Sequence, residues 1–160
     1  MIRVLFVCLG NICRSPMAEA IFRQQVKEAG LEDQIQTDSA GTGDWHVGKP
    51  PHEGTRKLLM QKNIDAGGLL ARQLHIDDFG KFDYIVAMDD SNYTSIAQLF
   101  ERHGKGKHPR LVKMLFFHPT QSNGDVPDPY YTGNFEEVYE LLDASCREFL
   151  EQIRKDNTLR

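Results

Sequence analysis

A cysteine and an arginine, followed directly by a serine, have types and a spacing that could do chemistry. Five residues separate Cys8 from Arg14, and Ser15 comes next. A cysteine thiolate is a strong nucleophile, and the planar guanidinium of arginine can bind two oxygens of one phosphoryl group. A serine hydroxyl can hydrogen-bond the sulfur, which helps when the sulfur must later leave. This spacing is what phosphoryl transfer through a phosphocysteine requires.

The segments on either side of these residues are expected to be a strand and a helix. Residues 4–7 form a short apolar run rich in β-branched and aromatic side chains, which is typical of a buried strand. Pro16 suits the first turn of a helix, where its missing N–H is not needed, and Ser15 is a good N-cap. Good helix formers then continue to a glycine, so the sequence predicts a helix over 17–29.

The loop between strand and helix is predicted to form a cradle for an oxyanion. Gly10 and Asn11 are residue types that tolerate the positive φ angles of a tightly curled loop. Such a loop turns its backbone N–H groups inward, and the helix N-terminus adds partial positive charge. A thiolate is stabilised in the same surroundings, so we expect Cys8 to be ionised near neutral pH. A zinc site is disfavoured, because no second cysteine or histidine pair accompanies Cys8 and Cys13.

A second motif over residues 125–131 places Asp128 between two prolines. The prolines stiffen the backbone and disfavour a helix, so the carboxyl group can be held out on a loop. Dephosphorylation by a thiolate needs an acid for the leaving oxygen and then a base for water. A phosphate dianion beside Asp128 in a partly desolvated cleft would keep the carboxyl group protonated. Taken alone, however, the motif is more typical of a turn.

Trp45 is the one tryptophan of the chain and lies in a turn-rich, glycine-containing segment over residues 41–51. An aromatic side chain on such a loop can form a wall for a substrate ring. It can equally well cover the edge of the core. The residues alone leave both interpretations open.

The composition is that of a globular chain whose 160 residues we expect to form one domain, 1–160. The formal net charge of −4 argues against a general nucleic-acid binder, and no apolar run approaches the ~20 residues of a membrane span. Three cysteines, an odd number, do not suggest a disulfide framework, and with no recognisable secretory signal they predict a cytoplasmic protein. The basic residues that cluster late in the chain are interpreted as a solvated face: Arg102, Lys105, Lys107, Arg110 and Lys113.

Strand-like and helix-like segments alternate along the rest of the chain. Further strands are expected over 35–40, 82–88 and 111–117. Further helices are expected over 52–63, from 90 or 91 to 100, and over 135–154. This alternation predicts an α/β fold, with one doubly wound sheet of four parallel strands in the order 2-1-3-4 and helices on both faces. In such sheets the site lies beyond the carboxyl ends of the strands.

Residues 8–19, Cys-Leu-Gly-Asn-Ile-Cys-Arg-Ser-Pro-Met-Ala-Glu, resemble the signature loop of the low-molecular-weight protein tyrosine phosphatases. The resemblance continues through most of the chain, including the segments around Trp45 and Asp128. It implies that Cys8 is the nucleophile, that Arg14 binds the phosphate and that Asp128 is the general acid.

The same resemblance implies roles for further residues. Most would bind the substrate, through the rest of the loop or as aromatic walls of the cleft: Leu9, Gly10, Asn11, Ile12, Cys13, Ser15, Trp45, Tyr130 and Tyr131. Ser39 and His75 would support the loop, with His75 holding Asn11. The chain departs from the common family pattern at His52, where an aspartate often follows the proline.

The function implied by the resemblance is hydrolysis of phosphotyrosine in proteins. The enzyme is expected to be a monomer that needs no metal or other cofactor and binds neither nucleic acid nor membranes. An arsenate reductase is an alternative, but it would need further cysteines to relay a disulfide, and Cys146 in a predicted helix is a poor candidate. A phosphoarginine phosphatase on the same scaffold has a threonine where this chain has Ile12. A phosphate-binding module without turnover would not need Cys8, Arg14 and Asp128 together.

Cys13 lies on the same loop as Cys8, which suggests a redox switch. An accessible thiolate is the form that peroxide attacks first, and the two sulfurs could then form a disulfide that blocks the anion cradle and that thiols reverse. In the alternative interpretation, Cys13 only packs beneath the loop as a small apolar side chain.

Overall fold

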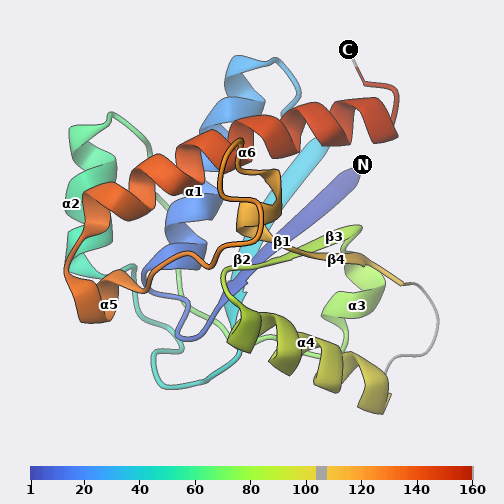
Figure 1. The fold of residues 1–160 in the computed structure, drawn as a ribbon, viewed down its shortest axis with the longest axis horizontal. Helices are drawn as coiled ribbons and strands as arrows, with labels where there is room; N and C mark the ends of the chain where they lie inside the picture. The colour runs from blue at the N-terminus through green and yellow to red at the C-terminus, as the bar shows by residue number, and fades with distance from the viewer. Residues whose placement is uncertain (104–107, 160) are drawn as a thin grey trace.

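Four parallel strands form one sheet in the order β2-β1-β3-β4, and helices cover both of its faces (Figure 1). The computed structural model describes residues 1–103 and 108–159, and it confirms the predicted α/β class and strand order. The strands are β1 (Ile2–Cys8), β2 (Ile35–Gly41), β3 (Tyr84–Ala87) and β4 (Arg110–Lys113). The helices are α1 (Arg14–Glu28), α2 (Glu53–Gln61), α3 (Asp78–Lys81), α4 (Asp90–His103), the 3₁₀ helix η1 (Met114–Phe117), α5 (Pro129–Thr132) and α6 (Phe135–Asp156).

The central strand β1 is apolar on both sides of the sheet. Because successive side chains of a strand point to opposite faces, Val4 and Phe6 contribute to the larger core under α1, α2 and α6. Leu5 and Val7 contribute to the smaller core under α3 and α4. All four side chains are fully buried. This is the pattern expected of a parallel strand that is covered on both faces.

An aromatic cluster fixes α1 and α6 on the sheet. The ring of Phe149 on α6 stacks on Phe22 of α1 with 5.2 Å between centroids, and Phe6 of β1 meets Phe22 edge-on at 5.5 Å. Tyr84 and Phe117 also contact the ring of Phe149. This packing holds the N-terminal end of α1 next to the carboxyl end of β1, where the loop between the two elements lies (Figure 1).

Two predicted boundaries are wrong. Helix α1 begins at Arg14, so Ser15 is inside the helix, and no side chain caps its N-terminus. The Ser15 hydroxyl bonds other side chains of the loop instead. The fourth strand, predicted over 111–117, ends at Lys113, and the rest of that run forms η1. An apolar run by itself does not distinguish a strand from a buried helical turn.

Other expectations concern single residues. Cys146 is fully buried on α6, as predicted for a residue that fills the core. In the predicted basic cluster, Lys105 and Lys107 lie outside the described residues, whereas Arg110 and Lys113 form ion pairs with nearby carboxylates. Among the helices of the described residues, none is long and apolar enough to cross a membrane.

Candidate active site

The loop between β1 and α1 curls at the carboxyl end of the sheet. Asn11 has a φ of 57°, a left-handed conformation that asparagine tolerates better than most residues. The positive φ expected at Gly10 is not observed; instead, a Cβ at Gly10 would come 3.1 Å from the His46 ring. At the end of β2, a Cβ on Gly41 would come 2.8 Å from the Leu9 carbonyl oxygen, so a glycine there lets the loop pack closely.

The sulfur of Cys8, at the end of β1, accepts hydrogen bonds from this loop. The backbone N–H of Asn11 donates to Sγ over 3.2 Å, and Ser15 Oγ lies 3.0 Å from the sulfur. Because Asn11 Nδ2 donates to Ser15 Oγ over 2.7 Å, the serine's own proton is left for one of two acceptors, the Cys8 sulfur at 3.0 Å or the Ala40 carbonyl oxygen at 3.4 Å. Hydrogen bonds to a charged form favour that form, so the arrangement stabilises a thiolate.

The side chain of Asn11 ties the loop to its surroundings. The backbone N–H of Arg72 donates to Asn11 Oδ1 over 3.0 Å, which fixes the orientation of the amide. Nδ2 then donates to Ser39 as well as to Ser15, over 3.0 Å and 2.7 Å. The Ser39 hydroxyl donates to Glu19 over 2.7 Å. Burial raises the pKa of Glu19, and the hydrogen bond from Ser39 opposes that shift. Ser39 thus lies in the network in which the resemblance placed it.

His75 does not hold Asn11, and that prediction is wrong. Its side chain is two-thirds exposed, and its Nδ1 accepts a hydrogen bond from the backbone of Asp77. An earlier residue of the same segment, Arg72, contacts the loop instead, and its backbone N–H donates the hydrogen bond to Asn11. A backbone donor can come from almost any residue type, so the sequence carried no signal for this contact.

Arg14 is buried at the N-terminus of α1 and is held by groups from two other segments. Nη1 donates to Asp89 over 2.7 Å and to the carbonyl oxygen of Val126 over 2.9 Å, and Nη2 lies 3.4 Å from Asp128. Burial alone would lower the pKa of Arg14, but the charges of Cys8, Asp89 and Asp128 outweigh it and raise the pKa. The guanidinium is therefore a fixed cation beside the sulfur.

Asp89 is a site residue that the sequence analysis missed. Its carboxylate accepts from the backbone N–H of Asn92 over 2.7 Å and also pairs with Arg14. The available signal was its position directly after the apolar third strand, next to β1 in the sheet. Carboxyl ends of neighbouring parallel strands meet at one edge, so Asp89 had to lie near the Cys8 loop.

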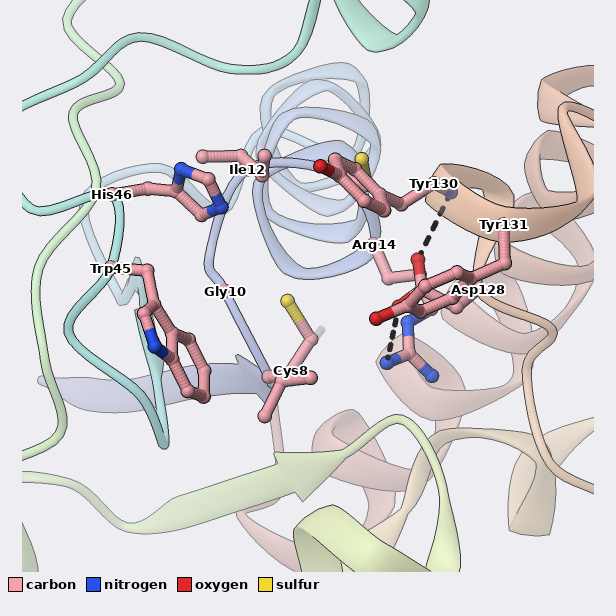
Figure 2. Close-up of a pocket in the computed structure, with 11 residues that line it drawn as sticks. Cys8, Gly10, Ile12, Arg14, Trp45, His46, Asp128, Tyr130 and Tyr131 are labelled. Carbon is pink, nitrogen blue, oxygen red and sulfur yellow. Dashed lines mark hydrogen bonds and ion pairs between the residues drawn. The ribbon is translucent and has the colours of Figure 1, made fainter.

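Asp128 caps the one-turn helix α5 with its side chain. Oδ1 accepts from the backbone N–H of Tyr130 over 3.1 Å, while Oδ2 faces Arg14. Pro129 is the first residue of α5, a position in which proline is favoured. The cap and the prolines hold the carboxyl group over the loop, as Figure 2 shows by the dashed lines from Asp128 to Tyr130 and Arg14.

These side chains meet in one cavity of about 200 Å³. The Cys8 sulfur points into the space between Trp45 and His46 on one side and Asp128 with Tyr131 on the other (Figure 2). The predicted residues Asn11, Ser15 and Ser39 are absent from its lining, and the first two contact the sulfur from behind. The lining comprises Cys8, Leu9, Gly10, Ile12, Cys13, Arg14, Trp45, His46, Asp128, Tyr130 and Tyr131.

One wall of the cavity comes from the loop after β2. The Trp45 side chain is 65% exposed and its ring lies against Gly43, where an added Cβ would come 2.0 Å from the indole. His46 also lines the cavity and was not predicted; its position beside Trp45 was the only sequence signal. Together with Tyr130, these rings give the cavity an aromatic lining that suits a planar aromatic group.

The arrangement can bind an anion and attack it. A sulfur that accepts a hydrogen bond from the Asn11 N–H and contacts the Ser15 hydroxyl lies at the base of the cavity, a buried guanidinium lies beside it, and a carboxyl group faces both. Within the described part of the chain, no group of three or more histidine, cysteine or acidic side chains is placed to hold a metal ion.

Comparison with known sequences identifies the family. A family model described as low molecular weight phosphotyrosine protein phosphatase matches residues 3–159. The chain is 50% identical over 159 residues to the low molecular weight protein-tyrosine-phosphatase YfkJ of Bacillus subtilis, covering 99% of this chain and 100% of the relative. It is 48% identical over 160 residues to the low molecular weight protein-tyrosine-phosphatase PtpA of Staphylococcus aureus, covering 100% of this chain and 99% of the relative.

Solved structures agree with the sequence relatives. The crystal structure of Bacillus subtilis YfkJ matches with a TM-score of 0.91 at 49% identity, covering 98% of this chain and 96% of that chain. A Drosophila arginine phosphatase matches with a TM-score of 0.88 at 33% identity, covering 94% and 97%. The chain therefore belongs to the low molecular weight protein-tyrosine-phosphatase family and is a protein-tyrosine phosphatase.

Proposed function

We propose that Cys8, Arg14 and Asp128 hydrolyse phosphotyrosine in proteins through a phosphocysteine intermediate. The observation that carries the proposal is their convergence: all three line one cavity, and the sulfur lies at its base between aromatic walls. A phosphotyrosine side chain entering this cavity would bring its phosphate to the sulfur and its ring between Trp45 on one side and Tyr130 and Tyr131 on the other. The N–H groups of the loop and the guanidinium would bind the phosphoryl oxygens.

The reaction takes two steps on these residues. In the first, the Cys8 thiolate attacks phosphorus, the bond to the tyrosyl oxygen breaks, and Asp128 gives its proton to that oxygen. In the second, the Asp128 carboxylate takes a proton from water, the water oxygen attacks phosphorus, and the bond between sulfur and phosphorus breaks. The thiolate returns with the Ser15 hydroxyl in contact. Arg14 stabilises the charge on the phosphoryl oxygens in both steps.

Ile12 is the residue that favours phosphotyrosine over phosphoarginine. It lines the cavity with an apolar side chain and offers no hydrogen bond to a guanidinium. Because the chain also matches an arginine phosphatase at 33% identity, phosphoarginine is the substrate to compare with phosphotyrosine. Arsenate reduction is less well supported, because burial raises the pKa of Cys146 and the residue lies inside α6.

We further propose that the enzyme works as a monomeric single domain, 1–160, in the cytoplasm, without a cofactor and without nucleic-acid or membrane partners. Its three cysteines are free thiols, which suits a reducing compartment. The formal charge of −4 does not favour nucleic acid.

Substrate choice can be tested with matched peptides that carry phosphotyrosine, phosphoserine or phosphoarginine, with arsenate assayed in parallel. We expect phosphotyrosine to be hydrolysed at least about tenfold more efficiently, because only its ring fills the aromatic cavity. Cys8→Ser is the control: it should lose turnover about a thousandfold or more yet still bind vanadate, since the loop and Arg14 remain. Faster hydrolysis of phosphoarginine would contradict the proposal that phosphotyrosine is the substrate. Rapid turnover by Cys8→Ser would contradict the phosphocysteine intermediate.

Asp128→Asn tests the general acid. The asparagine can still accept from Tyr130 and cap α5, so the change removes the titratable proton and the ion pair with Arg14 but keeps the helix cap. We expect kcat/KM, which reports the first step and not hydrolysis of the phosphocysteine, to fall about 100-fold or more for phenyl phosphate and much less for nitrophenyl phosphate, whose leaving group needs no proton. Steady-state rates over a series of leaving groups would show this as a steeper dependence on leaving-group basicity. An equal loss across the series would mean that Asp128 is not the acid.

We also propose that Cys13 protects Cys8 from over-oxidation. Burial, followed by the charges of Asp128 and Cys8, raises the pKa of Cys13 to about 12, so Cys13 is a thiol at neutral pH and Cys8 reacts with peroxide first. Peroxide oxidises the Cys8 thiolate to a sulfenic acid and is reduced to water. The Cys13 sulfur can then attack the Cys8 sulfur, which forms a disulfide and releases water.

Recovery after peroxide tests this protection. Wild type and Cys13→Ser are treated with mild peroxide and then with a dithiol, and their phosphatase activity is measured. Wild type should regain most of its activity because a dithiol reduces the disulfide, whereas Cys13→Ser should regain little because sulfinic acid is not reduced by thiols. Equal recovery in both proteins would show that Cys13 only packs beneath the loop.

A further inference from the structure

His52 contacts both helix α2 and the loop over residues 9–13 between β1 and α1, which we call the phosphate loop. Its backbone N–H donates to the carbonyl oxygen of Ile12 over 2.7 Å. Its side chain caps α2, because Nδ1 accepts from the backbone N–H of Gly54 over 3.0 Å. An aspartate could supply the same cap. The cap therefore does not explain why an imidazole ring is present.

The ring of His52 makes contacts that no aspartate could make. It stacks on Phe135, the first residue of α6, with 5.4 Å between centroids and 20° between planes. It also meets Tyr130 edge-on at 6.0 Å and 78°. Phe135 also packs against Gly54, where an added Cβ would come 2.4 Å from the ring. His52 is thus held between a rigid support and a wall of the cavity.

Tyr130 links this ring to the acid. It lines the cavity, and its backbone N–H donates to the Asp128 carboxylate. Tyr130 is 54% exposed, so few other contacts hold it. Its other ring neighbours are Tyr131 and, more distantly, His46 at 6.5 Å. A ring behind Tyr130 that is itself fixed to the phosphate loop can set the width of the cavity.

We infer that His52 is a positioning residue that holds Tyr130, and through it the segment carrying Asp128, at a fixed place opposite the phosphate loop. The inference rests on the proposed function, because it assigns Tyr130 to the wall that contacts the substrate ring. Its effect should be specific: binding of an aromatic substrate depends on His52, whereas binding of inorganic phosphate at the loop does not.

Two substitutions separate the cap from the ring. His52→Asn keeps an acceptor for Gly54 and loses the ring; we expect KM for phenyl phosphate to rise about three- to tenfold, the size expected for one aromatic pair. Its inhibition constant for inorganic phosphate should stay within about twofold. His52→Phe keeps the ring and loses the acceptor, so it should retain a KM close to wild type while its thermal midpoint falls by a few degrees.

A double-mutant cycle shows whether His52 acts through Tyr130. In a Tyr130→Leu background, His52→Asn should cause no further loss, because the wall it positions is already gone. Phe135→Leu, which leaves the cap and His52 intact, should reproduce the rise in KM. Additive losses, or an unchanged KM in His52→Asn, would overturn the inference. Failure of wild type to hydrolyse phosphotyrosine peptides would instead contradict the proposed function, so the two failures are distinguishable.

Discussion

The geometry of the active site depends on the side chain of Asn11. A left-handed backbone costs a residue other than glycine about 1 kcal/mol or more. Three side-chain hydrogen bonds, to Arg72, Ser15 and Ser39, hold Asn11 in that conformation, and each contributes about 1 kcal/mol. In this conformation the backbone N–H of Asn11 donates to the Cys8 sulfur, and the loop stays curled. Partners from α1, β2 and the segment before α3 thus converge on one asparagine, and the sheet and its two cores serve to hold these elements in place.

The second constraint is electrostatic. Arg14 is a buried cation, and a buried charge must be paired. Asp89 and the Val126 carbonyl oxygen bind one end of the guanidinium, and Asp128 approaches the other. A lysine could not make these bonds together and still present N–H groups to a phosphoryl group.

Much of this architecture is predictable from the sequence, and the exceptions have physical reasons. The apolar runs of β1 and β3 and the amphipathic α6 carry strong periodic signals, so the order of the sheet follows. The Cys8 loop is a local motif that is found from spacing, whereas the Asp128 segment taken alone is typical of a turn and gains its role from the resemblance. The pairing of Arg14 with Asp89 joins residues 75 positions apart, so it needs the register of β3 against β1.

Other misses arose where a polar residue had more than one use. Ser15 was predicted to cap α1, but its hydroxyl bonds the sulfur and Asn11, because a helix that binds an anion leaves its N-terminal N–H groups free. The role of His75 was implied by the family resemblance, whereas a backbone N–H of Arg72 makes the contact. Which of these hydrogen bonds forms depends on which groups lie close together in the folded chain, and residue types alone do not show that.

The central claim is that the phosphoryl group is transferred to the Cys8 sulfur. Rapid denaturing quench of wild type during turnover, followed by mass spectrometry, should find a phosphoryl group on the peptide containing Cys8, whereas steady turnover with no phosphorylated Cys8 peptide would contradict the account.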